Sequence, residues 1–439
     1  MTGLSARRLA SAVAVSAVSA VAFALPAASA SASTSIKGEG STLQELAQNN
    51  VFIPGFNAKE ATGLKDTVEM YNGPGSTTGS GAALEAWGNN GHAAEYNTYE
   101  YVGTDQPPNP TQKTAIETKA GGATVLSIPT LQAAVAIIIQ LPEGCTSADS
   151  SDTKAPHRLV LNNVTLEGIF AHKITKWSQI KEGGDKLLPL GCEAAHEEIT
   201  RVVREEGSGT TAILKKYLYQ INSGAVDGVK TWNNLAEENK NLSWPEEGVN
   251  LVRGKGSGGV VTKVTETDGS IGYVNLANAY SKFHGEGGTL FWAWVQKNGI
   301  ATTKPSYENP EKPKVVKKVA QEGTSNCAGD IYVNGVGAKF PPKKTSEAWN
   351  EVSSSPKNKK YALCGFTYDL SLNGFTKIEP ALQPTGEQIT EVKNYFAYML
   401  GEGGAQFATN QQDYEGLPTN SNPEKNVKKI AEEGQAEIQ

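Results

Sequence analysis

The chain has 439 residues, of which 38% are hydrophobic and 20% are charged, and its formal net charge at pH 7 is −6. This length exceeds one typical hydrophobic core, so two domains are expected. The acidic balance argues against nucleic acid or an anionic membrane as a partner, and an anionic ligand would have to be held by local donors.

Residues 1–30 have the pattern of a secretory signal peptide. Arg7 and Arg8 form a basic start, residues 9–25 are apolar or small, and residues 28–30 fit a small-residue cleavage site. An N-terminal membrane anchor is the alternative interpretation. From the signal-peptide interpretation we expect an exported protein that is periplasmic, extracellular or at the cell surface. We expect no lipid anchor attached through an N-terminal Cys.

Four cysteines in an exported chain predict two disulfides. Of the three connectivities, we favour Cys145–Cys192 with Cys327–Cys364, because each pair brackets an insertion-like segment. The five His residues are scattered and there is no Cys-x-x-Cys, so neither a metal site nor a cofactor is expected.

Two early segments share one pattern, a strand followed by a Gly/Ser turn and a helix start. In residues 36–43 the turn places Ser41 and Thr42 at the opening of a helix, where a simple N-cap is the alternative to a ligand contact. In residues 68–87 a strand to Tyr71 is followed by a loop containing Ser76 and Ser80, and then by a helix from residue 82.

The next elements alternate between strand and helix. Residues 99–105 predict a strand with Asp105 at its end, and residues 111–119 a helix. Residues 124–141 are apolar and β-branched and predict a long buried strand, with a domain crossing near Ile128. A short helix is expected over residues 165–170.

Residues 199–216 carry the most informative pattern. A β-branched strand, Ile199 to Val203, is followed by Arg204, by Gly207-Ser208-Gly209 and by a helix from Thr210. Backbone N–H groups at a helix N-terminus are electropositive, and the guanidinium and hydroxyls add donors, so the stretch suits a small tetrahedral oxyanion. An ordinary turn capped by Ser208 is the alternative.

The remaining segments complete an alternating chain. Residues 254–259 match G-x-G-x-x-G, but a helix-opening turn explains them better than a dinucleotide site. Residues 284–360 predict an irregular region, 361–370 a strand and second crossing, and 385–400 an amphipathic helix. Residues 424–439 predict a charged helix that frays. The alternation indicates an α/β fold with mainly parallel sheets.

These segments together resemble the phosphate-binding proteins of ABC-type phosphate transporters, a family of periplasmic substrate-binding proteins. Six segments occur in the family's order: residues 38–43, 101–105, 128–130, 169–177, 204–211 and 269–274. The resemblance implies a two-lobed, periplasmic-binding-protein-like (type II) α/β fold with two mixed α/β domains joined by hinge strands. Lobe I would be residues 35–127 and 365–439, and lobe II residues 128–364 with an enlarged loop region at 284–360.

The resemblance also implies a phosphate site made of eight residues: Thr42, Leu43, Ser80, Asp105, Arg204, Ser208, Gly209 and Thr210. Ser41, Ser76 and Glu206 would support it. Asp105 would accept the proton that phosphate still carries and sulfate lacks, and Arg204 would bind two oxygens. Ser76 is the alternative to Ser80, because the loop is longer than the family's. Glu206 stands where an Asp is usual, and Leu43 where an aromatic is usual.

The function implied is capture of inorganic phosphate for uptake. The chain would be a monomer that closes around phosphate by hinge motion and is recognised by ABC transporter permease subunits, with no catalysis and no nucleic acid partner. One alternative is a secreted receptor or scavenger for another oxyanion. Another is an exported phosphatase or serine hydrolase using Ser208, which lacks the G-x-S-x-G pattern.

Overall fold

The computed structural model describes most of the chain from Thr34 onward. The described residues are 34–60, 67–147, 159–180, 189–190, 198–238, 240–283, 290–297, 299–300, 306–311, 327, 332–333, 349, 352–353, 360–409, 413–423 and 426–439. The predicted signal peptide lies outside these residues, as does most of the predicted irregular region 284–360.

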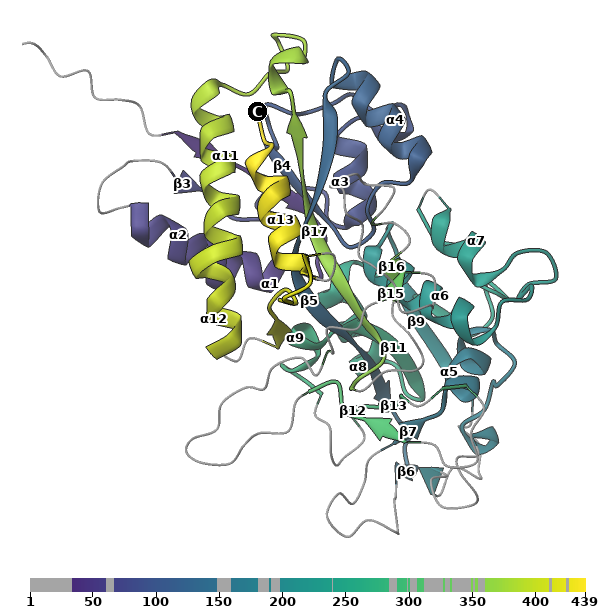
Figure 1. Ribbon diagram of the computed structural model, residues 1–439. Coiled ribbons are helices and arrows are strands. Elements are labelled where there is room, and N and C mark those ends of the chain that lie inside the picture. Colours follow the sequence, from purple (N-terminus) through teal and green to yellow (C-terminus); the bar gives the residue numbers. More distant parts are fainter. Residues whose placement is uncertain are drawn as a thin grey trace, which may run out of the picture. The chain divides into compact units, whose positions relative to one another are not determined.

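A nine-stranded sheet organises the described chain (Figure 1). Seven strands follow the order β10-β9-β11-β5-β17-β4-β2, and β12 and β18 also pair with β5. Their bounds are β2 Gly38–Gly40, β4 Tyr101–Thr104, β5 Thr124–Gln140, β9 Thr200–Arg204, β10 Leu251–Gly254, β11 Ser270–Asn275, β12 Leu290–Trp292, β17 Cys364–Asn373 and β18 Tyr414–Glu415.

The long strand β5 joins the two ends of this sheet. Its β-branched, apolar sequence is buried on both faces, as predicted for residues 124–141. Residues Thr124–Ala134 pair with β17, whereas Val135–Gln140 pair with β11. We therefore call β2, β4, β17 and the first part of β5 the first half of the sheet, and β9, β10, β11 and the second part of β5 the second half.

The prediction of mainly parallel sheets is wrong. Strand pairs β2–β4, β9–β10 and β9–β11 are parallel, but β5 is antiparallel to β11, β12, β17 and β18, and β17 is antiparallel to β4. β5 and β17 lie side by side in opposite directions (Figure 1). The outer strand pairs are parallel, as expected when a helix connects successive strands. The two long strands, β5 and β17, run antiparallel to their neighbours in the middle of the sheet.

Helices flank the sheet along both halves. Their bounds are α1 Glu45–Ala47, α2 Ile53–Glu60, α3 Ser80–Ala86, α4 Pro110–Lys119, α5 Asn163–Phe170, α6 Gly209–Ile221, α7 Trp232–Glu237, α8 Gly256–Glu266, α9 Leu276–Ala279, α11 Gly386–Tyr398, α12 Gly404–Thr409 and α13 Val427–Ala436. Short 3-10 or π turns lie at η1 Gln48–Phe52, η2 Asn89–Gly91, η3 Trp177–Gln179, η4 Phe375–Lys377 and η5 Met399–Gly403.

The smaller strands form separate ribbons. They are β1 Ser35–Ile36 with β3 Thr67–Val68, β6 Thr146–Ser147 with β8 Pro189–Leu190, β7 Val160–Leu161 with β13 Trp294–Gln296 and β14 Tyr307–Glu308, and β15 Tyr332–Val333 with β16 Val352–Ser353. The predicted strand at 68–71 is therefore shorter than expected and pairs outside the main sheet.

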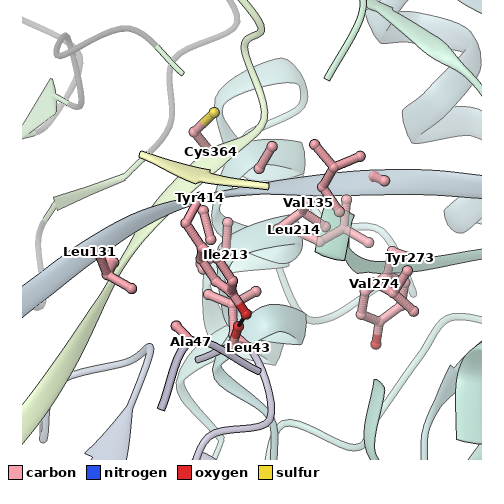
Figure 2. Packing of buried hydrophobic residues seen from close by; sticks show 14 of the residues in the cluster. Leu43, Ala47, Leu131, Val135, Ile213, Leu214, Tyr273, Val274, Cys364 and Tyr414 are labelled. Atoms are coloured by element: carbon pink, nitrogen blue, oxygen red, sulfur yellow. Dashed lines mark hydrogen bonds between the residues drawn. The ribbon is translucent and has the colours of Figure 1, made fainter. Parts of the chain in front are cut away.

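One apolar cluster connects the sheet to helix α6. Figure 2 shows Val135 of β5 beside Leu214 of α6. A Cβ atom on Gly365 of β17 would lie 2.3 Å from the Cδ1 atom of Ile213, so any larger residue at position 365 would force the Ile213 side chain to shift. The core thus fixes α6, whose N-terminus carries several predicted ligand residues.

The prediction that the C-terminal helix frays is wrong. The apolar side of α13, including Val427, Ile430 and Ala431, is buried, and Figure 1 shows α13 beside α11. The carbonyl of Gln439 accepts backbone hydrogen bonds from Gly374 at 2.9 Å and Phe375 at 2.6 Å. Docking of the apolar face stabilises a helix whose sequence is otherwise charged.

The disulfide prediction is confirmed for one pair. Cys327 is bonded to Cys364, the first residue of β17. Cys145 is disulfide-bonded as well, and its predicted partner Cys192 lies outside the described residues. No helix within the described ranges combines the length and apolar character needed to cross a membrane.

Candidate functional site

The predicted site residues follow the carboxyl ends of two pairs of parallel strands. In the first half of the sheet, Gly40 of β2 is paired with Gly103 of β4, and the next residues include Ser41 and Asp105. In the second half, Arg204 of β9 is paired with Gly254 of β10. Ligands of α/β proteins bind at such strand ends, because the following loops and helix N-termini converge there.

Asp105 is the centre of the first group. Its side chain is 6% exposed, the Ser41 hydroxyl donates a hydrogen bond to Oδ1, and the Asp105 N–H donates to Ser80 Oγ at 3.1 Å. Burial raises the pKa of the Asp105 carboxyl to about 6, while the Ser41 hydroxyl and the Arg204 guanidinium oppose that rise. At pH 7 and above the carboxylate is therefore ionised and can accept a hydrogen bond from a ligand that carries a proton.

The structure brings Ser80 rather than Ser76 to Asp105. Ser80 is the first residue of α3, after Gly79 with a φ of 110°. The amide of Ser76 instead donates to the carbonyl of Gly73 within the preceding turn, at 3.1 Å. Of the two serines left open by the sequence, Ser80 has the geometry expected of a site residue.

The N-terminus of α6 reaches this first group directly. A Cβ atom on Gly209 would lie 2.5 Å from the Cβ atom of Asp105 and 2.7 Å from Ser80 Oγ, far inside contact distance. The Ser208 hydroxyl caps α6 by accepting the N–H of Thr211 at 3.3 Å. Glycine at position 209 thus lets the loops from the two halves of the sheet meet.

Arg204 supplies a buried positive charge. Its side chain is 2% exposed at the end of β9 and forms an ion pair with Glu206. Burial lowers the pKa of the guanidinium to about 10, and the negative charge of Asp105 is among the groups that oppose this. The guanidinium stays charged at neutral pH, at a high desolvation cost.

Three buried polar atoms in this group have no hydrogen-bond partner within the described part of the chain. They are Asp105 Oδ2, Arg204 Nε and Thr210 Oγ1. Buried polar atoms are rarely left unbonded, because each costs about 1–3 kcal/mol. One acceptor, one cationic donor and one hydroxyl match a tetrahedral anion that still carries a proton.

The residues that follow β2 form hydrogen bonds with other protein groups. The Thr42 and Ser257 hydroxyls are 3.0 Å apart, and the Leu43 N–H donates to Ser41 Oγ at 3.0 Å. The Tyr414 hydroxyl points to the Leu43 carbonyl and donates to it at 2.7 Å, as Figure 2 shows. In this structure the predicted donors of Thr42 and Leu43 therefore hold the loop in place.

The helix-opening turn predicted at residues 254–259 is confirmed as the start of α8, but its contacts with two predicted site residues were not foreseen. The Gly256 N–H lies 3.2 Å from both carboxylate oxygens of Glu206, and the Ser257 N–H donates to Thr42 Oγ1 at 3.3 Å. Residues 249–259 have the same strand, Gly/Ser turn and helix pattern as the predicted site loops, so the signal was present. It was interpreted only as a helix-opening turn.

The chemistry of the described site involves no recognisable metal cluster. No group of three or more His, Cys, Asp or Glu side chains that could hold a metal ion occurs among the described residues. The cationic group at the site is instead Arg204, supported by the N-termini of α3, α6 and α8.

Curated proteins with similar sequences are phosphate-binding proteins. The phosphate-binding protein PstS of Xylella fastidiosa is 33% identical over 128 residues, which are 29% of this chain and 31% of that protein. PstS of Methanocaldococcus jannaschii is 31% identical over 156 residues, 35% of each chain. PstS of Haemophilus influenzae is 28% identical over 219 residues, 49% of this chain and 58% of that protein. The chain thus spans from about a third to somewhat over half the length of these relatives.

Solved structures show the same fold at low sequence identity. A structure described as a DING protein has a TM-score of 0.57 and 16% identity, and the match covers 91% of this chain and 92% of that one. A high affinity periplasmic phosphate-binding protein bound with phosphate has a TM-score of 0.54 and 18% identity, with coverage of 88% and 91%. These matches confirm the predicted periplasmic-binding-protein-like fold.

A family model agrees with both comparisons. The model described as a PBP superfamily domain matches residues 25–334, which is more than half of the chain. The predicted resemblance is confirmed, and the chain belongs to the PBP superfamily.

Proposed function

We propose that this protein captures inorganic phosphate outside the cytoplasm and delivers it to the permease subunits of an ABC transporter. The single observation that carries the proposal is the set of unbonded buried atoms of Asp105, Arg204 and Thr210. HPO₄²⁻ can accept hydrogen bonds from Arg204 and Thr210 and donate a hydrogen bond to the Asp105 carboxylate. The relatives named as phosphate-binding proteins support the same ligand.

The proposed site uses all eight predicted residues, although in different ways. Asp105, Arg204 and Thr210 would contact phosphate through side chains, and Ser80, Ser208 and Gly209 would present hydroxyl or backbone donors at helix starts. Thr42 would contact phosphate through its backbone N–H, because its hydroxyl bonds to Ser257. The Leu43 N–H would contact phosphate by giving up its hydrogen bond to Ser41 Oγ. Ser41 and Glu206 would orient Asp105 and Arg204.

Binding would act through closure of two lobes. Lobe I would contain residues 35–127 and 365–439 and lobe II residues 128–364, with β5 and β17 as the hinge strands. Phosphate that contacts both lobes would stabilise the closed form, which the permease would recognise. The chain would act as an exported monomer after removal of residues 1–30, without an N-terminal lipid and without catalysing a reaction.

Arg204→Ala tests the assignment of the cation. A charged ligand without its buried counter-charge loses about 3–5 kcal/mol, so phosphate affinity should fall at least about a hundredfold. Isothermal titration calorimetry of the mature wild-type protein and the variant measures this.

A matched control is Lys263→Ala. Lys263 lies on α8 and forms an exposed ion pair with Glu266, so its loss removes one positive charge away from the site. Phosphate affinity should be unchanged in this control. Equal affinities of wild type and Arg204→Ala would refute the proposed site.

A further inference from the structure

Asn241 is a buried residue whose side chain is hydrogen-bonded to both the N–H and the carbonyl of Ser208. The Ser208 N–H donates to Asn241 Oδ1 at 3.2 Å, and Asn241 Nδ2 donates to the Ser208 carbonyl at 2.8 Å. Asn241 is 4% exposed and has a φ of 43°, a conformation that asparagine tolerates better than most residues. Two reciprocal bonds fix both the position and the direction of the residue that caps α6.

Lys215 holds the segment that carries Asn241. Its ammonium is fully buried in α6 and donates to the carbonyls of Asn241 at 2.7 Å, Ser243 at 2.7 Å and Leu235 at 3.2 Å. It also lies 4.5 Å from the centre of the Trp244 ring. Its hydrogen bonds reach one carbonyl of α7, that of Leu235, and two carbonyls of the segment after it, those of Asn241 and Ser243, so Lys215 connects α6 to α7 and to the segment that carries Asn241.

The same segment also reaches the loop after β4. Asn241 Nδ2 is 3.4 Å from Gln106 Oε1, and Gln106 Nε2 donates to the carbonyl of Ala236 at 3.2 Å. Gln106 directly follows Asp105. The side chain of Asn241 therefore contacts both the cap of α6 and the neighbour of the acidic site residue.

We propose that Asn241, held in place by Lys215, is a positioning residue that aligns the N-terminus of α6 with the loop carrying Asp105, so that phosphate affinity depends on a side chain that does not bind phosphate. This inference rests on the proposed function for its ligand. Both polar atoms of the Asn241 side chain are engaged with protein groups, so its contribution comes from the geometry of Ser208, Gly209 and Thr210.

The test uses Asn241→Gly. Glycine accepts a positive φ without strain, so this change removes the two side-chain bonds to Ser208 and the longer one to Gln106, and leaves the backbone path intact. Loss of two hydrogen bonds that align donors should lower phosphate affinity about ten- to a hundredfold. The control is Asn250→Gly, because Asn250 also has a positive φ, of 46°, and bonds only weakly to Glu198 Oε2 at 3.4 Å. Its affinity should equal that of wild type.

A second measurement separates positioning from general destabilisation. Hydrogen exchange at the amides of residues 208–211 in phosphate-free protein should be faster in Asn241→Gly and unchanged in Asn250→Gly. Lys215→Met, which keeps the length of the side chain and removes the charge, should show the same local effect. If that variant does not fold, Asn241→Gly decides the question alone.

The outcomes distinguish the two proposals. Wild-type affinity in Asn241→Gly, or equal losses in Asn241→Gly and Asn250→Gly, would overturn the positioning role. Faster local exchange with unchanged affinity would also overturn it. If the wild-type protein binds no phosphate, the proposed function fails, and the exchange measurement still tests whether Asn241 orders the start of α6.

Discussion

Gly209→Ala introduces one methyl group where the two groups of site residues meet. The added Cβ atom would lie 2.5 Å from the Cβ atom of Asp105, 2.7 Å from Ser80 Oγ and 2.8 Å from the Asp105 Cα atom. Carbon atoms in contact are about 3.5–4.0 Å apart. The α6 N-terminus and the Asp105 loop must therefore separate by about 1–1.5 Å.

This displacement is large relative to a hydrogen bond. Donor–acceptor distances near 2.9 Å would lengthen beyond the bonding range, so one ligand could no longer contact both groups of residues closely. Inserting a methyl group into a packed contact costs about 1–3 kcal/mol. We therefore expect phosphate affinity to fall about 5- to 150-fold.

The assay compares Gly209→Ala with Gly258→Ala. Gly258 lies in α8, and a Cβ atom there would meet nothing within 4 Å, so this control adds a methyl group without a clash. Without phosphate, Gly258→Ala should keep or raise thermal stability, because alanine favours helix over glycine. In Gly209→Ala the clash with Asp105 and Ser80 offsets that gain. Phosphate should raise the melting temperature of Gly258→Ala as in wild type and raise that of Gly209→Ala much less. Equal phosphate-induced shifts would refute the reasoning.

The buried acids make stability depend on pH and make the choice of anion depend on Asp105. Burial raises the pKa values of Asp105 to about 6 and of Asp369 and Glu39 to about 7, so their stabilising contribution is complete in acid and is lost as the pH rises through these values. The free energy of unfolding without phosphate should therefore fall between pH 4 and pH 8, and urea denaturation that showed a rise over this range would contradict this. Asp105→Asn should weaken phosphate binding, strengthen sulfate binding and narrow the ratio of the two affinities at least about tenfold; competition titrations measure the ratio, and an unchanged ratio would speak against proton recognition.

The elements that position the site were predictable because their signals are local. The β-branched run of β5, the strand before Arg204 and the Gly/Ser turns depend on neighbouring residues, and all were found. The choice between Ser76 and Ser80 was not local, because both lie in one Gly/Ser loop. It depends on which serine meets Asp105, and this is set by the packing of α3.

The missed features depend on contacts between distant segments. The antiparallel direction of β5 and β17 follows from pairing across more than 200 residues, which strand patterns do not encode. Asn241 belongs to no motif, and its role arises because Lys215 holds its segment beside Ser208. Ser257 was visible as a repeated turn pattern, but its contact with Thr42 is a tertiary one.

The most direct test of the central claim is a calorimetric titration of the mature protein with phosphate and with sulfate at pH 8, where Asp105 is ionised. The account predicts one phosphate per chain and sulfate binding at least about a hundredfold weaker, because sulfate has no proton to donate to a buried carboxylate. Equal affinities for the two anions, or no binding of phosphate, would contradict it.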